Sequence, residues 1–313
     1  MLMFKRWMAG CAVLVAPLPT MAQALRPQPQ QVAPGVYMVQ GVSALGSSAN
    51  RNFISNAAFV VTPEGVLVVD ALGSPVLARE LLAEIRRITS APVRYVVLTH
   101  YHADHIYGLQ VFKEAGATIL AHHDAQWYLN SETAALRLQA SREEMAPAID
   151  LETRLVPADR WIDKPLTLTL GGTEFVLQPV GPAHTPEDMV VWMPQRKLMF
   201  AGDLVFRGRV PFVGQADSGR WIQALDTLLA FDAKLIIPGH GPATTSARAD
   251  LQLTRDYLAY LRKTMGEAAQ NMDPFEEAYA RTDWSRFDKL PLFNAANRMN
   301  AYNTYLLMEQ AAK

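Results

Sequence analysis

Short runs of apolar residues, separated by turn residues, fill most of the first 240 positions of the chain. Three pairs of such runs flank short segments that contain Gly or Pro, and they therefore predict β-hairpins. The paired runs are 57–62 with 66–69, 166–170 with 173–180, and 189–193 with 197–200. Further apolar runs predict single strands at 35–40, 93–98, 118–121 and 233–237.

Helical spacing of apolar residues occurs between and after these runs. Leucine and isoleucine residues recur on one side of the segment 75–90, as they do in an amphipathic helix. Further helices are predicted at 108–115, 125–144 (a lid or insertion), 220–230, 247–270, 274–281 and 293–312. This order of elements predicts an α/β fold in which two stacked β-sheets lie between helices, with helical additions.

The length and composition of the chain suit a single large domain. It has 313 residues, of which 50% are hydrophobic, enough to bury an extended core. Its 29 basic and 30 acidic residues nearly cancel and form no basic block, which argues against nucleic acid as a partner. We expect a domain at residues 25–246 and a helical extension, residues 247–313, packed on it.

The first 24 residues have the pattern of a secretory signal peptide. Two basic residues precede an apolar stretch, 7–18, that is too short to span a bilayer. A small-x-small pattern then predicts cleavage after Ala24, with Ala22 as the alternative. The mature protein is expected in the periplasm or outside the cell, without a membrane span; an uncleaved anchor is the alternative. The only cysteine, Cys11, would be removed, so no thiolate could bind metal.

One stretch concentrates the candidate chemistry. The run that ends at Leu98 is followed by Thr-His-Tyr-His-Ala-Asp-His, residues 99–105. Three imidazoles and a carboxylate therefore lie on a strand-to-helix loop, where functional groups are usually displayed. Imidazole nitrogens and carboxylate oxygens are the ligands of catalytic zinc, which favours a metal site. A chance polar loop or a pH-sensitive histidine patch is the alternative explanation.

Three later positions share one pattern, in which a predicted strand is followed by a metal-binding residue beside Gly or Pro. They are His184 after Gly-Pro-Ala, Asp203 after Ala-Gly, and His240 between two glycines. The glycines allow tight turns and close backbone approach. Together with residues 99–105, these positions supply five histidines and two aspartates, enough for two metal ions.

These motifs resemble those of the metallo-β-lactamase-fold hydrolases. The resemblance covers residues 32–243 and implies an αβ/βα sandwich with the site at the sheet edges. It implies that one zinc is bound by His100, His102 and His184, and a second by Asp104, His105 and His240, with Asp203 as a bridge. Asp70 matches an acidic residue of the family at a strand end and is expected to orient a ligand imidazole.

The resemblance also implies a mechanism. Two Zn²⁺ ions lower the pKa of a shared water, and the resulting hydroxide attacks a carbonyl carbon of a small-molecule substrate. The first zinc polarises the carbonyl oxygen, and the second stabilises the leaving group. Asp104 is expected to hold the nucleophile and accept its proton, in addition to binding metal.

Within this family, the stretch 181–192 is close to that of true zinc β-lactamases. Those enzymes carry Cys where Asp203 stands, and usually a cation shortly after it, where this chain has Phe206. Arg207 and Arg209 are near, so these two cations and Phe206 are candidate substrate-binding residues.

The ligands Asp203 and His105 look more like those of glyoxalase-II-type thioesterases. The whole pattern looks most like the exported, Sox-type quinoprotein-relay zinc metallohydrolases. The sequence thus predicts an exported dinuclear zinc hydrolase of an ester, thioester or lactam. Two alternatives are a β-lactamase and an iron-loaded oxidoreductase, since both share the fold.

Overall fold

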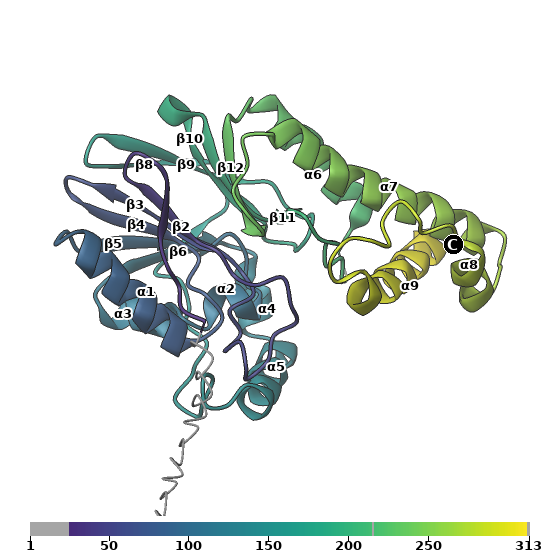
Figure 1. The fold of residues 1–313 in the computed structure, drawn as a ribbon, viewed down its shortest axis with the longest axis horizontal. Helices are drawn as coiled ribbons and strands as arrows, with labels where there is room; N and C mark the ends of the chain where they lie inside the picture. The colour runs from purple at the N-terminus through teal and green to yellow at the C-terminus, as the bar shows by residue number, and fades with distance from the viewer. Residues whose placement is uncertain (1–24, 215, 312–313) are drawn as a thin grey trace, which may run out of the picture.

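The computed structural model describes residues 25–214 and 216–311. Residues 1–24, where the sequence predicts the signal peptide and where Cys11 stands, lie outside the described residues. The described chain forms two β-sheets stacked face to face, with helices on both outer faces (Figure 1). The predicted αβ/βα sandwich is therefore confirmed.

The first sheet has seven strands that follow the order of the chain. Neighbours are antiparallel from β1 to β4 and parallel from β4 to β7. The strands are β1 (Gln30–Ala33), β2 (Val36–Val39), β3 (Ala57–Thr62), β4 (Gly65–Val69), β5 (Val93–Val97), β6 (Thr118–His122) and β7 (Arg160–Ile162). The parallel half brings the ends of β4, β5 and β6 to one edge, where the loops after them meet.

The second sheet has five strands in the order β12-β11-β10-β9-β8. All its neighbours are antiparallel except β11 and β12, which run parallel. The strands are β8 (Leu166–Leu170), β9 (Thr173–Pro179), β10 (Met189–Met193), β11 (Leu198–Phe206) and β12 (Leu235–His240), and the 3₁₀ turn η1 (Pro194–Arg196) joins β10 to β11.

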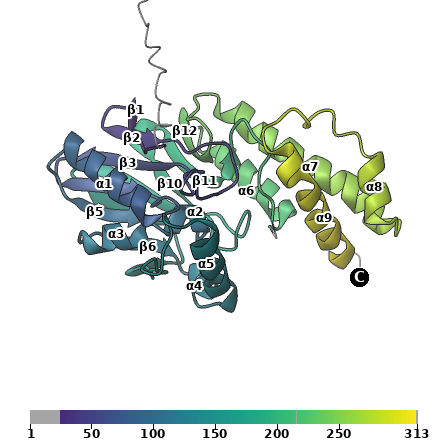
Figure 2. The ribbon, with the colours of Figure 1, turned by 60° about the horizontal axis from the view of Figure 1, so that its bottom comes forward.

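Helices cover the outer face of each sheet. On the first sheet, α1 (Pro75–Ile88) and α3 (Leu109–Glu114) pack side by side. The short helices α2 (Ala103–Ile106) and α4 (Ala125–Leu129), and then α5 (Glu132–Glu144), lie near one end of that sheet (Figure 2). On the second sheet, α6 (Ser218–Ala230) packs on α7 (Ala247–Gln270), which also contacts β11. Beyond them, α8 (Phe275–Arg281) and α9 (Phe293–Ala311) pack on α7.

Burial on both faces explains why the central strands β3, β4 and β10 consist of continuous, largely apolar runs. In β3 and β4, Phe59 and Val68 face the helices, whereas Ala58 and Leu67 face the second sheet. Residues of β10 alternate in the same way, between the sheet–sheet core and the core under α6 and α7. The periodicity of two along each strand therefore builds three stacked cores.

The structure differs from the sequence-based expectations at several element boundaries. Strands β1 and β7 were not predicted, and both are short edge strands with exposed residues. The predicted helix 125–144 is divided at Asn130 because the side chain of Ser131 caps the new helix by accepting a hydrogen bond from the Ala134 amide. In the second sheet, β11 and β12 continue through Asp203 and His240 instead of ending before them.

The C-terminal segment is helical, as predicted, and α7 to α9 lie on the opposite side of the molecule from α1 and α3 (Figures 1 and 2). Its polar contacts continue into the domain, since Arg207 at the end of β11 forms a salt bridge with Asp250 of α7 at 3.0 Å. Among the described residues, no helix combines the length and the apolar character that a membrane crossing requires.

Candidate metal centre

Seven side chains from four segments of the chain meet at one edge of the sandwich. Four come from the segment 100–105 after β5, and His184 comes from the loop before β10. Asp203 comes from β11, and His240 from the end of the neighbouring parallel strand β12. The structure thus brings together all seven residues that the sequence predicts as metal ligands.

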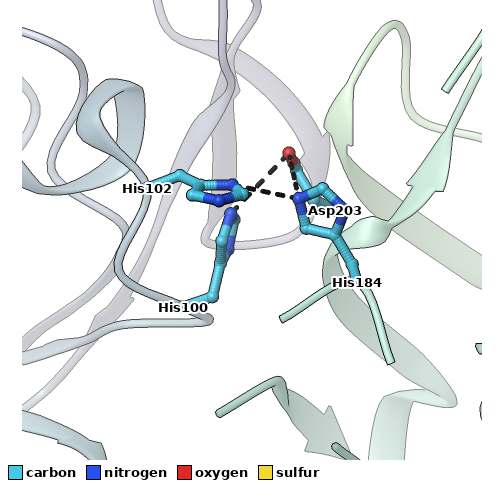
Figure 3. Close-up of side chains that lie close together, drawn as sticks. All are labelled: His100, His102, His184 and Asp203. Carbon is cyan, nitrogen blue, oxygen red and sulfur yellow. Dashed lines mark hydrogen bonds and ion pairs between the residues drawn. The ribbon is translucent and has the colours of Figure 1, made fainter. Parts of the chain in front are cut away.

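The first donor group consists of three imidazoles and a carboxylate. His100, His102, His184 and Asp203 point toward one another from two sides of the site (Figure 3). Nδ1 of His102 lies 3.0 Å from Nε2 of His184. The Asp203 Oδ2 atom lies 3.5 Å from Nε2 of His184 and 3.7 Å from Nε2 of His100.

The second donor group consists of Asp104, His105 and His240. Oδ2 of Asp104 lies 3.6 Å from Nε2 of His105 and 3.4 Å from Nε2 of His240. Asp203 also faces this group, with Oδ1 at 3.2 Å from His105 Nε2 and Oδ2 at 3.2 Å from His240 Nε2. The carboxylate of Asp203 is therefore the point at which the two groups meet.

The donor set fits divalent metal ions. Nε2 of His100, Nε2 of His105 and Oδ1 of Asp203 are buried without a hydrogen-bond partner among the described residues, although burying such atoms unpaired is costly. Donors at the corners of a tetrahedron around zinc, with bonds of about 2.0–2.2 Å, lie about 3.3–3.6 Å apart. The neighbouring donors here are 3.0–3.7 Å apart. A bound cation would satisfy the orphaned atoms.

The electrostatics of the cluster point the same way. Burial, together with the neighbouring histidines, holds the pKa of His100 and His184 well below the usual value, which keeps them in the neutral form that binds metal. Burial alone would lower the pKa of His105 too, but the carboxylates of Asp203, Asp104 and Asp70 raise it well above its usual value. The carboxylates thus favour a positive charge among them, which a proton or a metal ion can supply.

Contacts behind the ligands fix their orientation. Nδ1 of His105 donates to Oδ2 of Asp70 at 2.9 Å, so Nε2 is left to face the cluster. The Asp70 carboxylate also accepts from the amide and the hydroxyl of Thr99, both at 2.9 Å. Nδ1 of His240 donates to the carbonyl of Ile54 at 2.7 Å. Asp70 therefore lies where the sequence places it, in contact with a ligand imidazole.

Asp70 adopts a backbone conformation that non-glycine residues rarely take, with φ of 61°. The conformation turns the chain at the end of β4, so that the carboxylate can reach both Thr99 and His105. Such strain persists only where surrounding contacts hold it, and the three hydrogen bonds to this carboxylate supply them.

The three candidate substrate residues lie beside His240. Phe206 is buried, and its ring stacks on the imidazole of His240 with centroids 4.9 Å apart. Arg209 is also buried, with Nη1 at 3.4 Å from Nδ1 of His240. Arg207 is turned to Asp250 and to the carbonyl of Ala243, so its charge is already partnered. Phe206 and Arg209 thus both contact the imidazole of His240.

Two buried polar residues support the site without a sequence pattern that indicates them. The side-chain Nδ2 of Asn56 donates to the backbone carbonyls of Pro238 and Gly241, on both sides of His240, at 2.8 and 2.7 Å. Glu187 accepts a hydrogen bond from the amide of Tyr101, between two ligand histidines. The sequence around Asn56 shows only a polar residue next to an apolar strand. It gives no sign of the supporting role, because the hydrogen-bond partners of Asn56 lie far away in sequence.

The family model of the Metallo-beta-lactamase superfamily matches residues 50–240, which span all seven donor residues. The chain belongs to this superfamily. The matched region begins before β3 and ends at His240, so it covers most of both sheets.

The chain is similar to several curated proteins, among them an alkylsulfatase and a metallo-beta-lactamase. The chain is 26% identical over 238 residues to a linear primary-alkylsulfatase of Pseudomonas sp. (strain ATCC 19151), covering 64% of this chain and 45% of that protein. It is 30% identical over 192 residues to a type 2 metallo-beta-lactamase of Bacillus sp. (strain 170), covering 60% and 66%. The chain thus spans between about half and two thirds of these relatives' lengths.

Solved structures show the same fold. The sec-alkylsulfatase Pisa1 of Pseudomonas sp. superposes with a TM-score of 0.69 at 20% identity, covering 90% of this chain and 50% of that one. A metallo-beta-lactamase from Pontibacter korlensis superposes with a TM-score of 0.57 at 23% identity, covering 74% and 98%. The likeness to Pisa1 therefore extends over more of this chain than the likeness to the lactamase does.

Proposed function

We propose that this superfamily member is an exported, dinuclear zinc hydrolase that cleaves an ester, thioester or lactam. One Zn²⁺ would be held by His100, His102 and His184, and the other by Asp104, His105 and His240. The observation that carries the proposal is the position of Asp203, whose two carboxylate oxygens face the donors of both groups.

When bound, two zinc ions would supply a water of lowered pKa and would polarise the scissile bond. Residues of the chain would position the water and transfer its proton. Asp203 has a side chain that is 4% exposed, so it is enclosed by the imidazoles, whereas Asp104 is 15% exposed and open to an incoming molecule. We therefore assign Asp104 to hold the attacking water and to accept its proton. Asp70 keeps the His105 ring fixed during this transfer.

The placement of the candidate substrate residues limits their roles. Substrate contact by Arg207 would require its salt bridge with Asp250 to break. Phe206 and Arg209 pack on the His240 imidazole, so we assign both to holding that ring. The substrate is then a small molecule that meets the partly exposed side of the cluster, near Asp104.

A hydrolysis panel on the mature protein, residues 25–313, tests the proposal. It should contain a cephalosporin, a carbapenem, an acyl-glutathione thioester, a lactone and an aryl ester, with a chelator control and the His102→Ala variant as the inactive reference. We expect two zinc ions per chain and chelator-sensitive turnover of an ester or thioester. Stoichiometric iron, or no zinc-dependent turnover of any member, would overturn the proposal. N-terminal sequencing of the exported protein should show cleavage after Ala24.

Hydrolysis of an alkyl sulfate ester is a second candidate, favoured by the sequence match to a primary alkylsulfatase over 238 residues. Adding a primary alkyl sulfate to the panel separates it from the lead, since sulfate release with untouched carboxylic esters would assign the sulfatase reaction. Rapid opening of the lactams, with the esters and thioester untouched, would assign the lactam reaction and make the protein a β-lactamase. Iron at stoichiometric levels would favour an oxidoreductase.

A further inference from the structure

We propose that Asn300, on the C-terminal helix α9, is a positioning residue of the metal centre. It acts through the site loop, which we define as residues 207–214 between β11 and α6. By holding this loop, Asn300 would keep Arg209 packed against His240. The inference rests on the proposed function only in taking His240 as a metal ligand.

Asn300 connects α9 to the site loop by hydrogen bonds. Asn300 is fully buried, and its carboxamide bonds the loop backbone twice. Its Oδ1 accepts from the amide of Val213 at 2.9 Å, and its Nδ2 donates to the carbonyl of Pro211 at 2.7 Å. A side chain from a distant helix thus takes the place of a strand or turn partner for these backbone groups.

A network of hydrogen bonds holds Asn300 itself. Nδ2 of Asn300 also donates to the hydroxyl of Tyr257 on α7 at 2.9 Å, and this hydroxyl donates to Oδ1 of Asn297 at 2.8 Å. Burial raises the pKa of Tyr257, which keeps its hydroxyl a proton donor. A buried polar network is favourable only when its members are all paired, so it fixes one arrangement of the loop and the two helices.

Arg209 connects the site loop to the metal centre. Arg209 lies with its guanidinium carbon 5.4 Å from the centroid of the Phe206 ring, which stacks on His240, and with Nη1 at 3.4 Å from His240 Nδ1. Among residues 25–214 and 216–311, Arg209 forms no salt bridge, although the carboxylates of Asp203 and Asp104 attract its charge. An enclosed guanidinium keeps such a place only when its surroundings hold it. The held loop would therefore act together with the Phe206 ring and these carboxylates to keep Arg209 beside His240.

The test compares two asparagines on the same helix. Asn300→Ala removes the two bonds to the site loop, whereas Asn297→Ala removes an equally buried carboxamide that bonds Tyr257 and Tyr279 but not the loop. Both variants lose contacts with Tyr257, so both should lower the melting temperature. Hydrogen–deuterium exchange of the peptide covering 207–214 and the rate of zinc release to a chelator are then measured on the full mature chain.

We expect Asn300→Ala to speed exchange of the Val213 amide by roughly tenfold, the scale of one lost hydrogen bond. It should also speed zinc release by roughly tenfold, the lower end of effects from contacts behind metal ligands. Asn297→Ala should change both rates less than twofold. Asn300→Ala should add no further acceleration of zinc release to that of Arg209→Ala, because the two residues act on His240 in series. Asn300→Ser, which keeps a neutral hydroxyl that can donate and accept hydrogen bonds, is the milder variant if Asn300→Ala does not fold.

Equal rates in the two single variants would overturn the proposal and assign Asn300 a purely structural role. Additive effects of Asn300→Ala and Arg209→Ala on zinc release would also overturn it. If the wild-type chain binds no zinc, the proposed function fails, and the exchange of the 207–214 peptide alone decides whether Asn300 holds the loop.

Discussion

Replacing Gly239 by alanine should dismantle the metal centre by forcing β11 and β12 apart beside it. A Cβ atom at this position would lie 2.0 Å from Oδ1 of Asp203, 2.7 Å from the backbone carbonyl carbon of Gly202 and 2.9 Å from the backbone nitrogen of Asp203, whereas ordinary contacts begin at 3.4 Å. The carboxylate would have to move by about 1.4 Å, and the backbone of β11 would have to shift as well. Metal–ligand distances tolerate errors of only about 0.2 Å, so a shift of this size removes Asp203 from both donor groups.

The measurement is the zinc content of the purified variant by mass spectrometry, followed by zinc affinity in a competition titration. We expect at least a 100-fold loss of affinity, which exceeds the roughly 10- to 100-fold effect of changing a contact behind a ligand. Gly219→Ala is the matched control, because its Cβ would meet only the end of the Arg262 side chain, at 3.1 Å. Full zinc content in Gly239→Ala would refute the reasoning and show that Asp203 is not a ligand.

Three further changes test other parts of the site. His102→Ala or Asp104→Ala should abolish hydrolysis with an unchanged circular dichroism spectrum, and retained turnover in either would contradict the assigned ligand set. Asp70→Ala, which leaves Nδ1 of His105 without its acceptor, should weaken zinc binding by roughly 10- to 100-fold in the same titration, whereas unchanged affinity would count against its orienting role. Removing metal with a chelator should lower the melting temperature: at a metal concentration 100 times Kd, binding contributes about 2.7 kcal/mol, or a shift of roughly 5–10 °C for a domain of this size. An identical melting temperature with and without chelator would indicate that these residues bind no metal.

Much of the fold follows from local sequence patterns. Continuous apolar runs gave β3 and β4 nearly at their observed bounds, because a strand buried on both faces must be apolar throughout. The hairpin of β8 and β9 was also predicted nearly at its observed bounds, with a Gly-Gly turn between two partly exposed strands. The edge strands β1 and β7 lacked that signal, since edge residues face solvent. The break between α4 and α5 depends on a single cap at Ser131, which a longer helical pattern obscured.

Part of the metal centre could also be predicted from the order and spacing of the donor residues along the chain. Residues 100–105 lie close together in the sequence, on the turn after β5 and in α2, so their types and spacing alone predicted a metal site. The positions of His184, Asp203 and His240 required the family resemblance, because nothing local says that β11 and β12 pair in parallel and end at the same edge. The close approach of Gly239 to Asp203 follows from that pairing.

Only the tertiary structure decided what supports the ligands. Asn56 bonds carbonyl groups more than 180 positions away, and Asn300 bonds a loop almost 90 positions before it. A buried side-chain carboxamide bonds the unpaired backbone groups that packing brings near it. The residues next to it in the sequence do not indicate which groups these are. The sequence by itself thus determined the elements and the chemistry of the donor residues, whereas packing between distant segments decided how these donors are held.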